Sequence, residues 1–150
     1  MNIVVVRPAN LYGEFDDYEW ETSHVIPALV RKVAERQNPI NVWGDGKDLK
    51  EFLYIDDFID GIILAMEKIN SSNPINLSLN KPVTVKEIIN HLIDIEGYSD
   101  AEVEYDITKP TMIPKRLIDN SQAKKLLNFN PQIDIKEGLS RTLNWYKSRK

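Results

Sequence analysis

Residues 3–6 read Ile-Val-Val-Val, and this unbroken β-branched run constrains the fold more than any other part of the sequence. A strand with one face in water alternates apolar and polar residues, whereas a strand of a parallel sheet is covered on both faces and reads as a continuous apolar run. The run therefore predicts a parallel strand buried on both faces. Because such a strand needs neighbours, we expect other strands of its sheet to lie outside this sequence, as part of a larger protein.

The composition limits the classes of protein that fit. A chain of 150 residues has the size of one domain and can bury a core. No apolar run approaches the length of a membrane span, and the net charge of -4 gives no general attraction to nucleic acid or to anionic membranes. There is no cysteine, which excludes disulfides and thiolate chemistry within the chain. No signal peptide precedes the first strand, so we expect a soluble, cytoplasmic protein.

The rest of the sequence alternates between strand and helix patterns, which predicts an α/β fold. Short strands are expected at 40–43, 52–55, 74–79 and around 103–105. Helices are expected after a cap at Thr22 or Ser23, after a cap at Asp56 or Asp57, from a capping box at Thr84 to a stop at Gly97, and at about 120–128 and 134–147. In the second helix the apolar spacing predicts a buried side made of Phe58, Ile59, Ile62, Ile63 and Met66.

Few residues carry obvious chemistry. The sequence has no glycine-rich phosphate loop and no recognisable arrangement of serine, histidine and acid. His24 and His91 are too far apart to suggest a metal site, and we expect none. His24 stands at the start of a predicted helix, where exposed amides attract anions and the helix dipole disfavours imidazolium. The residues alone leave two interpretations open: a catalytic or ligand-binding histidine, or an ordinary residue of a helix's first turn.

A tryptophan and several lysines surround the predicted turn Gly44-Asp45-Gly46. Trp43 stands directly before it, Lys47 and Lys50 follow it, and Lys32 lies in the preceding helix. An indole face can hold a nucleobase or sugar, and lysines can neutralise a diphosphate. The alternative is a core tryptophan with solubilising lysines around it, and the residues alone favour this alternative.

Three segments resemble one family. Residues 7–13, RPANLYG, are similar to the segment that ends a late Rossmann strand in the extended short-chain dehydrogenase/reductase family, also called the NAD-dependent epimerase/dehydratase family. WGDG at 43–46 with KEFLYIDD at 50–57 resembles a second characteristic segment, and 119–146 resembles the closing one. Together these similarities cover essentially the whole chain in the right order. The resemblance implies the end of a Rossmann-type parallel sheet followed by a small α/β substrate-binding domain.

Within the family, the loop that leads into SHVIPAL at 23–29 resembles the GDP-L-fucose synthase type, the NADP-dependent 3,5-epimerase/4-reductases of GDP-sugars. Residues 109–119 are also similar to that type, although Thr111 and Met112 depart from its pattern. This resemblance implies a GDP-sugar or another nucleotide-sugar as the ligand. Two alternatives stay open: a different NDP-sugar 4-epimerase or 4,6-dehydratase, and a non-catalytic nucleotide-sugar-binding module or truncated remnant.

The resemblance also implies a role for residues at the cofactor. His24 would lie beside NADP and act as the catalytic acid/base of epimerisation, a task that suits an imidazole near neutral pH. The matching segment of Pro8, Ala9, Asn10 and Leu11 would pass the nicotinamide end of the cofactor.

Three further positions match residues that hold the nucleotide-sugar in relatives. Trp43 would lie against the nucleotide, and Lys32 and Lys50 would lie near the phosphates. Both lysines stand where relatives usually have arginine, so each offers a point charge in place of a bidentate fork.

The family's glycine-rich dinucleotide loop and its Ser and Tyr-x-x-x-Lys catalytic set precede the strand at residues 3–6. The resemblance therefore implies that most of NADP binding belongs to an N-terminal half absent from this sequence. We expect residues 1–150 to form one domain, inactive alone, that works with such a half on the same or on a separate polypeptide. The family's usual helical dimer interface would also be missing, and the uncovered strand would favour self-association instead.

Overall fold

The computed structural model describes residues 3–109 and 113–149 and confirms an α/β fold with parallel strands. Six of the strands form three parallel pairs: β1 (Val6–Pro8) with β6 (Ile75–Leu77), β2 (Asn10–Tyr12) with β5 (Phe52–Tyr54), and β3 (Ile40–Trp43) with β8 (Val103–Asp106). A three-stranded sheet has the order β7 (Val83–Thr84), β4 (Leu49–Lys50), β9 (Lys115–Arg116), in which β4 runs antiparallel to β7 and parallel to β9.

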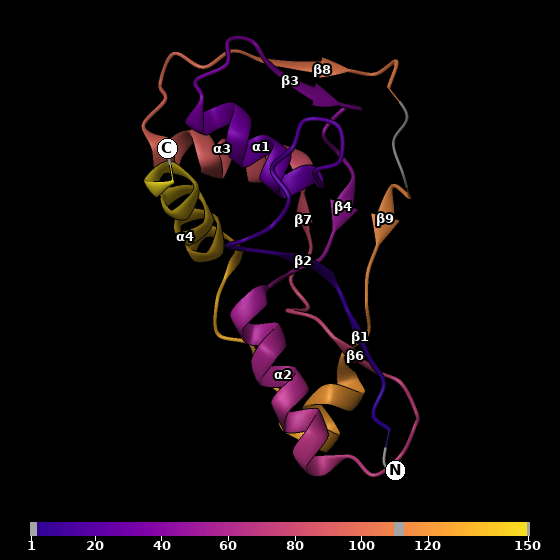
Figure 1. The fold of residues 1–150 in the computed structure, drawn as a ribbon. Coiled ribbons are helices and arrows are strands. Elements are labelled where there is room, and N and C mark those ends of the chain that lie inside the picture. Colours follow the sequence, from indigo (N-terminus) through magenta and orange to yellow (C-terminus); the bar gives the residue numbers. More distant parts are fainter. Residues whose placement is uncertain (1–2, 110–112, 150) are drawn as a thin grey trace.

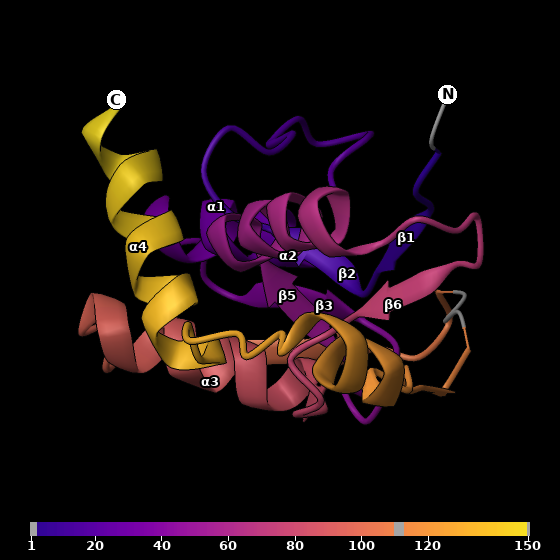
Figure 2. The ribbon, with the colours of Figure 1, turned by 90° about the horizontal axis from the view of Figure 1, so that it is seen from below.

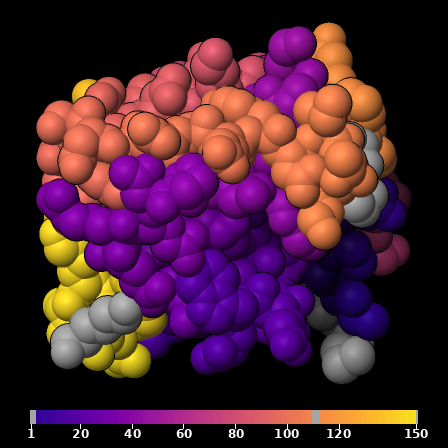
Figure 3. All heavy atoms as spheres, turned by 90° about the horizontal axis from the view of Figure 1, so that it is seen from above, coloured from indigo at the N-terminus to yellow at the C-terminus, as the bar shows by residue number. Residues whose placement is uncertain are grey.

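The helices of the described chain divide between two apolar cores. They are α1 (Val25–Ala34), α2 (Ile55–Lys68), α3 (Val85–Glu96), the π-helical turn η1 (Ala123–Leu127) and α4 (Ile135–Ser148). The larger core lies between α1, α3 and α4, and the smaller one lies between α2, η1 and the pair β1–β6. Figure 1 shows β2 running between these two parts, and Figure 2 shows α2 lying over the strands β2, β5 and β6. On the opposite side, β3 and β8 lie next to each other at the surface (Figure 3).

The strand predicted at residues 3–6 is parallel as expected, but it starts only at Val6. Ile3 is 55% exposed, and Val4 and Val5 are half-buried. Within the described residues this strand is therefore only partly covered, and its burial on both faces stays a prediction for a sheet completed by strands outside this sequence. The physical reason is that, among the described residues, β6 is the only strand paired with β1, and α2 packs against it from one side.

The start of α1 differs from the sequence expectation. His24 occupies the N-cap position with an extended backbone, and its side chain makes no capping hydrogen bond. Neither Thr22 nor Ser23 caps the helix, since both precede the N-cap position, and the Thr22 hydroxyl donates to the Asp17 carboxylate in the preceding loop. The loop therefore places His24 itself at the N-terminal end of α1.

The start and the buried side of α2 also differ from expectation. Neither aspartate caps the helix, since it begins at Ile55 and the two residues lie in its first turn. The predicted positions Ile59, Ile63 and Met66 are exposed, and the fully buried positions are Asp57, Gly61 and Ala65. The reason is the tight approach of this helix to β6: a Cβ added at Gly61 would lie 2.7 Å from a Leu77 methyl carbon.

Other helix signals are confirmed. Thr84 and Glu87 form the expected capping box, and Gly97 ends α3 with a left-handed backbone (φ 64°). The two helices expected near the C-terminus are present as η1 and α4. Gly138 allows α4 to approach β2, because a Cβ at this position would lie 2.0 Å from the Tyr12 hydroxyl oxygen.

Candidate functional site

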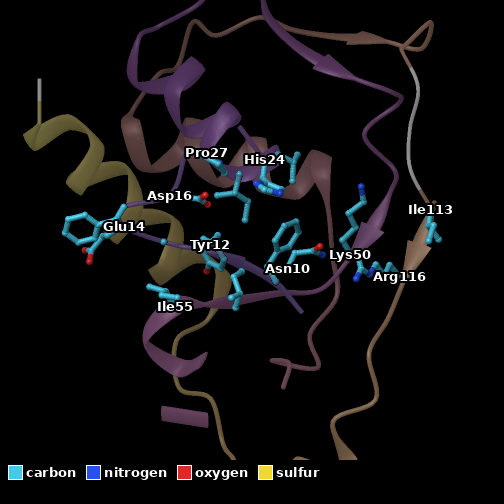
Figure 4. Close-up of a pocket in the computed structure, with 16 residues that line it drawn as sticks. Asn10, Tyr12, Glu14, Asp16, His24, Pro27, Lys50, Ile55, Ile113 and Arg116 are labelled. Atoms are coloured by element: carbon cyan, nitrogen blue, oxygen red, sulfur yellow. The ribbon is translucent and has the colours of Figure 1, made fainter. Parts of the chain in front are cut away.

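Two adjoining cavities open where β2, β4 and the start of α1 meet. The first, of about 670 Å³, is lined by β2, the loop after it, the first turn of α1 and side chains of β4, β5 and β9 (Figure 4). The second, of about 470 Å³, is lined by residues 20–24, α1, the end of β3 and the start of β4. His24, Val25 and Lys50 line both cavities, so the two spaces meet at these residues.

His24 is exposed at this junction. Its backbone carbonyl accepts a hydrogen bond from the Ala28 amide at 3.0 Å, which ties the residue to the first turn of α1. Figure 4 places its ring at the edge of the first cavity, across from Asn10 and Lys50. Hydrogen bonds from Thr22 and Glu19 lower the pKa of the Asp17 carboxyl, and the charge of nearby His24 adds to the effect. The structure thus brings His24 to a cavity edge, and its catalytic role stays a prediction.

The segment expected at the nicotinamide is only partly at the cavity. Asn10 and Leu11, in β2, line the first cavity. The Asn10 side-chain amide donates to the Glu51 carbonyl at 2.7 Å, which fixes its orientation. Pro8 and Ala9 line neither cavity, and Ala9 is buried in the smaller core, where its amide donates to Leu77.

Lys32 and Trp43 line the second cavity. Trp43 ends β3 and is 61% exposed, so it is not a core residue, and the Lys109 ammonium lies 5.7 Å from the centre of its ring. The Lys32 ammonium donates to the Asn41 carbonyl at 2.6 Å, and burial lowers its pKa below the ordinary value. An exposed indole and a tethered cation therefore share one cavity.

Lys50 joins the two cavities and is paired within the protein. Its ammonium nitrogen lies 3.2 Å from the Asp48 carboxylate, and Asp48 also lines the second cavity. Lys47, the neighbouring lysine that the turn places in solvent, pairs with Asp45 and lines neither cavity.

Arg116 and Trp20 are among the cavity residues that were not predicted from the sequence. Arg116 in β9 is the register neighbour of Lys50 in β4, and it brings a second cation to the first cavity (Figure 4). The sequence feature that could have pointed to Arg116 is the basic pair Lys115-Arg116, which lies within the segment 109–119 that resembles the family. Trp20 lines the second cavity and carries the Arg31 guanidinium 4.0 Å from its ring centre. No sequence pattern distinguished Trp20 from its loop neighbours.

Tyr12 forms an inner wall of the first cavity. Its side chain is buried between Phe52 and Tyr54, whose rings meet it edge-on with centroids 6.2 and 5.5 Å away. Burial raises the pKa of Tyr12 far above its ordinary value, and the nearby Tyr54 contributes less in the same direction. The phenol therefore stays neutral and packs α4 against the floor of the site.

Comparison with known proteins identifies the family. The model of the family described as "NAD dependent epimerase/dehydratase family" matches residues 1–78, a segment that holds β1, β2, α1 and both cavity lysines. The chain belongs to the NAD-dependent epimerase/dehydratase family. The match agrees with the sequence motifs at residues 7–13 and 43–57.

Individual members of the family show how much of the fold this chain contains. It is 33% identical over 143 residues to GDP-L-fucose synthase 1 of Arabidopsis thaliana, covering 93% of this chain and 44% of the relative. A UDP-glucuronic acid 4-epimerase from Bacillus cereus, solved with UDP-glucuronic acid and NAD, is 27% identical with a TM-score of 0.87, covering 100% of this chain and 46% of that one. A GDP-L-fucose synthetase from Naegleria fowleri is 25% identical with a TM-score of 0.87, and the match covers 94% of this chain and 44% of that one. The chain thus spans slightly less than half the length of these family members.

Two further properties bear on the site. Across residues 3–109 and 113–149, no helix combines the length and apolar character needed to cross a membrane. Within the same ranges, no three histidine, aspartate or glutamate side chains are grouped so that they could hold a metal ion.

Proposed function

We propose that residues 1–150 form the nucleotide-sugar-binding part of an NADP-dependent GDP-sugar 3,5-epimerase/4-reductase. In this proposal they are one domain that joins the end of a Rossmann-type sheet, at β1 and β6, to a small α/β substrate-binding domain. The dinucleotide-binding half lies outside these residues, and the chain alone does not turn over substrate. The 33% identity to a plant GDP-L-fucose synthase, over 44% of that relative, supports this assignment.

The observation that carries the proposal is the meeting of the two cavities at His24 and Lys50. A nucleotide-sugar has a base at one end, a sugar at the other and a diphosphate between them. The exposed Trp43 ring in the second cavity suits a base, the basic residues at the junction suit the diphosphate, and the first cavity suits the sugar. His24 would then face the sugar ring.

The residues of this chain would divide the work as follows. Lys50, Arg116 and Lys32 would offset the charge of the diphosphate, and the indole face of Trp43 would stack on the base. The His24 imidazole would exchange a proton with one face of a sugar carbon next to a carbonyl group, while a second acid/base group outside these residues would exchange the proton on the opposite face, which inverts that carbon. Imidazole suits this exchange because its pKa ordinarily lies near neutral pH.

The first cavity fits the nicotinamide end of NADP. Leu11, Phe52 and Ile55 give it apolar walls, and the fixed Asn10 side chain brings a polar group to its edge. When bound there, the nicotinamide supplies a hydride to a carbonyl carbon. Asn10 and Leu11 would orient the ring and exclude water, whereas Pro8 and Ala9 would act through the backbone that leads to them.

Titration calorimetry with GDP, UDP and NADPH tests the proposal. We expect the purified chain to bind GDP more tightly than UDP, and NADPH weakly because most of its binding surface lies elsewhere. Trp43→Ala should weaken GDP binding about tenfold through loss of base stacking, with folding checked by circular dichroism. Lys47→Ala, in the same turn but outside both cavities, is the matched control and should bind GDP as wild type does. Equal binding of GDP and UDP would favour a different NDP-sugar enzyme, and binding of neither would overturn the proposal.

The position of His24 is tested by following its ring signals in NMR during titration with a GDP-sugar. The His24 signals should shift because the residue lines both cavities. His91, in the middle of α3 and outside both cavities, serves as the internal control. Shifts of both histidines, or of neither, would contradict a sugar bound beside His24.

A further inference from the structure

Asp48 brings a negative charge into the cavity where the proposed function needs positive charge. Its carboxylate lies 3.2 Å from the Lys50 ammonium, and the two side chains are only 13% and 17% exposed. The pair Asp45–Lys47 on the same turn is as close, at 3.4 Å, but its side chains are 49% and 82% exposed. The Asp48–Lys50 pair is therefore a partly buried contact at the cavity wall, whereas its neighbour is an ordinary surface pair.

The backbone holds Asp48 in this place. Asp48 immediately precedes β4, and Lys50 is the second residue of that strand, so their side chains leave the same face of the chain. The Asp48 carbonyl accepts a hydrogen bond from the Val85 amide at 3.3 Å, which ties it to the start of α3. This hydrogen bond fixes the backbone from which the carboxylate projects toward Lys50.

Asp48 also offsets a repulsion within the sheet. Lys50 and Arg116 are register neighbours on parallel strands, and both line the first cavity. Like charges at neighbouring positions of a sheet are unfavourable. With no ligand present, Asp48 neutralises Lys50 beside Arg116.

A bound diphosphate changes this balance, because it brings negative charge to the same ammonium group. Lys50 would then lie between two anions, one fixed in the protein and one on the ligand. Two negative charges a few ångströms apart in a partly buried site repel each other substantially, so the Asp48 carboxylate would oppose the diphosphate. We propose that Asp48 is a built-in competitor of the diphosphate for Lys50, which weakens nucleotide binding and speeds release. This inference rests on the proposed function.

The inference predicts a gain of affinity on removing the charge. Asp48→Asn keeps the shape of the side chain, and we expect it to bind GDP about three- to tenfold more tightly, mainly through slower dissociation. Guanosine, which has no phosphate, should bind wild type and Asp48→Asn equally. Asp45→Asn removes the exposed carboxylate of the same turn and is the matched control, expected to leave GDP binding unchanged.

The route through Lys50 is tested by a double-mutant cycle with Lys50→Met. If Asp48 acts by competing for that ammonium, the gain from Asp48→Asn should shrink strongly in the Lys50→Met background, so the two effects are non-additive. Calorimetry gives the affinities, and the tryptophan fluorescence change on dilution gives the dissociation rate. Asp48→Ala replaces Asp48→Asn if circular dichroism shows that the latter does not fold.

The outcomes separate this inference from the function on which it rests. Wild-type binding of GDP with weaker or unchanged binding by the Asp48 variant would overturn the competition and leave the proposed function standing. Additive effects in the cycle would overturn the route through Lys50. Failure of wild type and variant alike to bind GDP would overturn the proposed function and the inference together.

Discussion

At the scale of the residue, two adjacent aspartates do different work. Asp56 is exposed and lies 3.6 Å from the Arg141 guanidinium. Asp57 is buried, and its two carboxylate oxygens accept hydrogen bonds from the Gln132 and Ile133 amides at 2.8 and 2.9 Å. Asp57 therefore joins α2 to the segment before α4. The sequence interpretation of this pair as caps missed that connection, because the partner amides lie about 75 positions further along the chain.

Replacing each aspartate by alanine should separate these roles. Asp57→Ala leaves the buried Ile133 amide and the partly buried Gln132 amide without this acceptor, and it should lower the free energy of unfolding by about 3 kcal/mol. Asp56→Ala removes an exposed ion pair and should cost less than about 0.5 kcal/mol. Urea denaturation of both variants measures the difference, and equal losses would contradict the assignment.

At the scale of the element, α3 is the helix whose ends follow most directly from its own sequence. The Glu87 carboxylate accepts hydrogen bonds from the Thr84 amide and hydroxyl, both at 2.7 Å, while the Thr84 hydroxyl oxygen accepts the Glu87 amide at 3.1 Å. The hydroxyl contact and then the amide contact lower the pKa of the Glu87 carboxyl. Every group in this motif lies within four residues, so no distant partner is needed.

The capping box gives a pH-dependent prediction. A carboxyl whose pKa is lower in the folded state stabilises the protein above its ordinary pKa, and this contribution is lost as the pH falls through the folded pKa. Thr84→Ala should cost about 1 kcal/mol at neutral pH and should flatten the acid part of the stability profile. Thr84→Ser, which keeps the hydroxyl, is the control and should behave nearly as wild type. Urea denaturation from pH 7 down to pH 3 gives both profiles, and an unchanged acid limb in Thr84→Ala would contradict the assignment.

At the scale of the whole molecule, α2 leaves an apolar stripe at the surface. Ile59, Ile63 and Met66 are spaced at i, i+4 and i+7 and are all exposed, although the sequence predicted them to be buried. A contiguous apolar stripe on a small protein favours association. The sequence pattern for a buried helix side is therefore present, but within the described chain nothing covers it.

We expect this stripe to drive self-association of the purified chain. The double substitution Ile59→Lys and Ile63→Lys should lower the sedimentation coefficient at high protein concentration and leave the melting temperature close to that of wild type, since neither side chain is buried. Ile107→Lys changes an isoleucine after β8 that is more exposed than either, away from the stripe, and serves as the control. Identical sedimentation of wild type and the double variant would show that association, if any, uses another surface.

The sequence alone determined the features that depend on neighbouring residues. The capping box, the stop at Gly97, the alternation of strands and helices and the family motifs all involve residues a few positions apart, and the structure or the comparisons confirm each of them. Local spacing also placed His24 at a helix start, although it predicted the wrong cap.

Only the tertiary structure decided which faces meet. His24, Lys50 and Arg116 reach one cavity although they are separated by dozens of positions in the sequence, because parallel pairing brings β9 beside β4 and β5 beside β2. The same packing buries Gly61 rather than Ile59 and places the Asp48–Lys50 pair at a cavity wall. Apolar periodicity shows that a helix has a side suited to burial, but contact with other elements decides which side is covered.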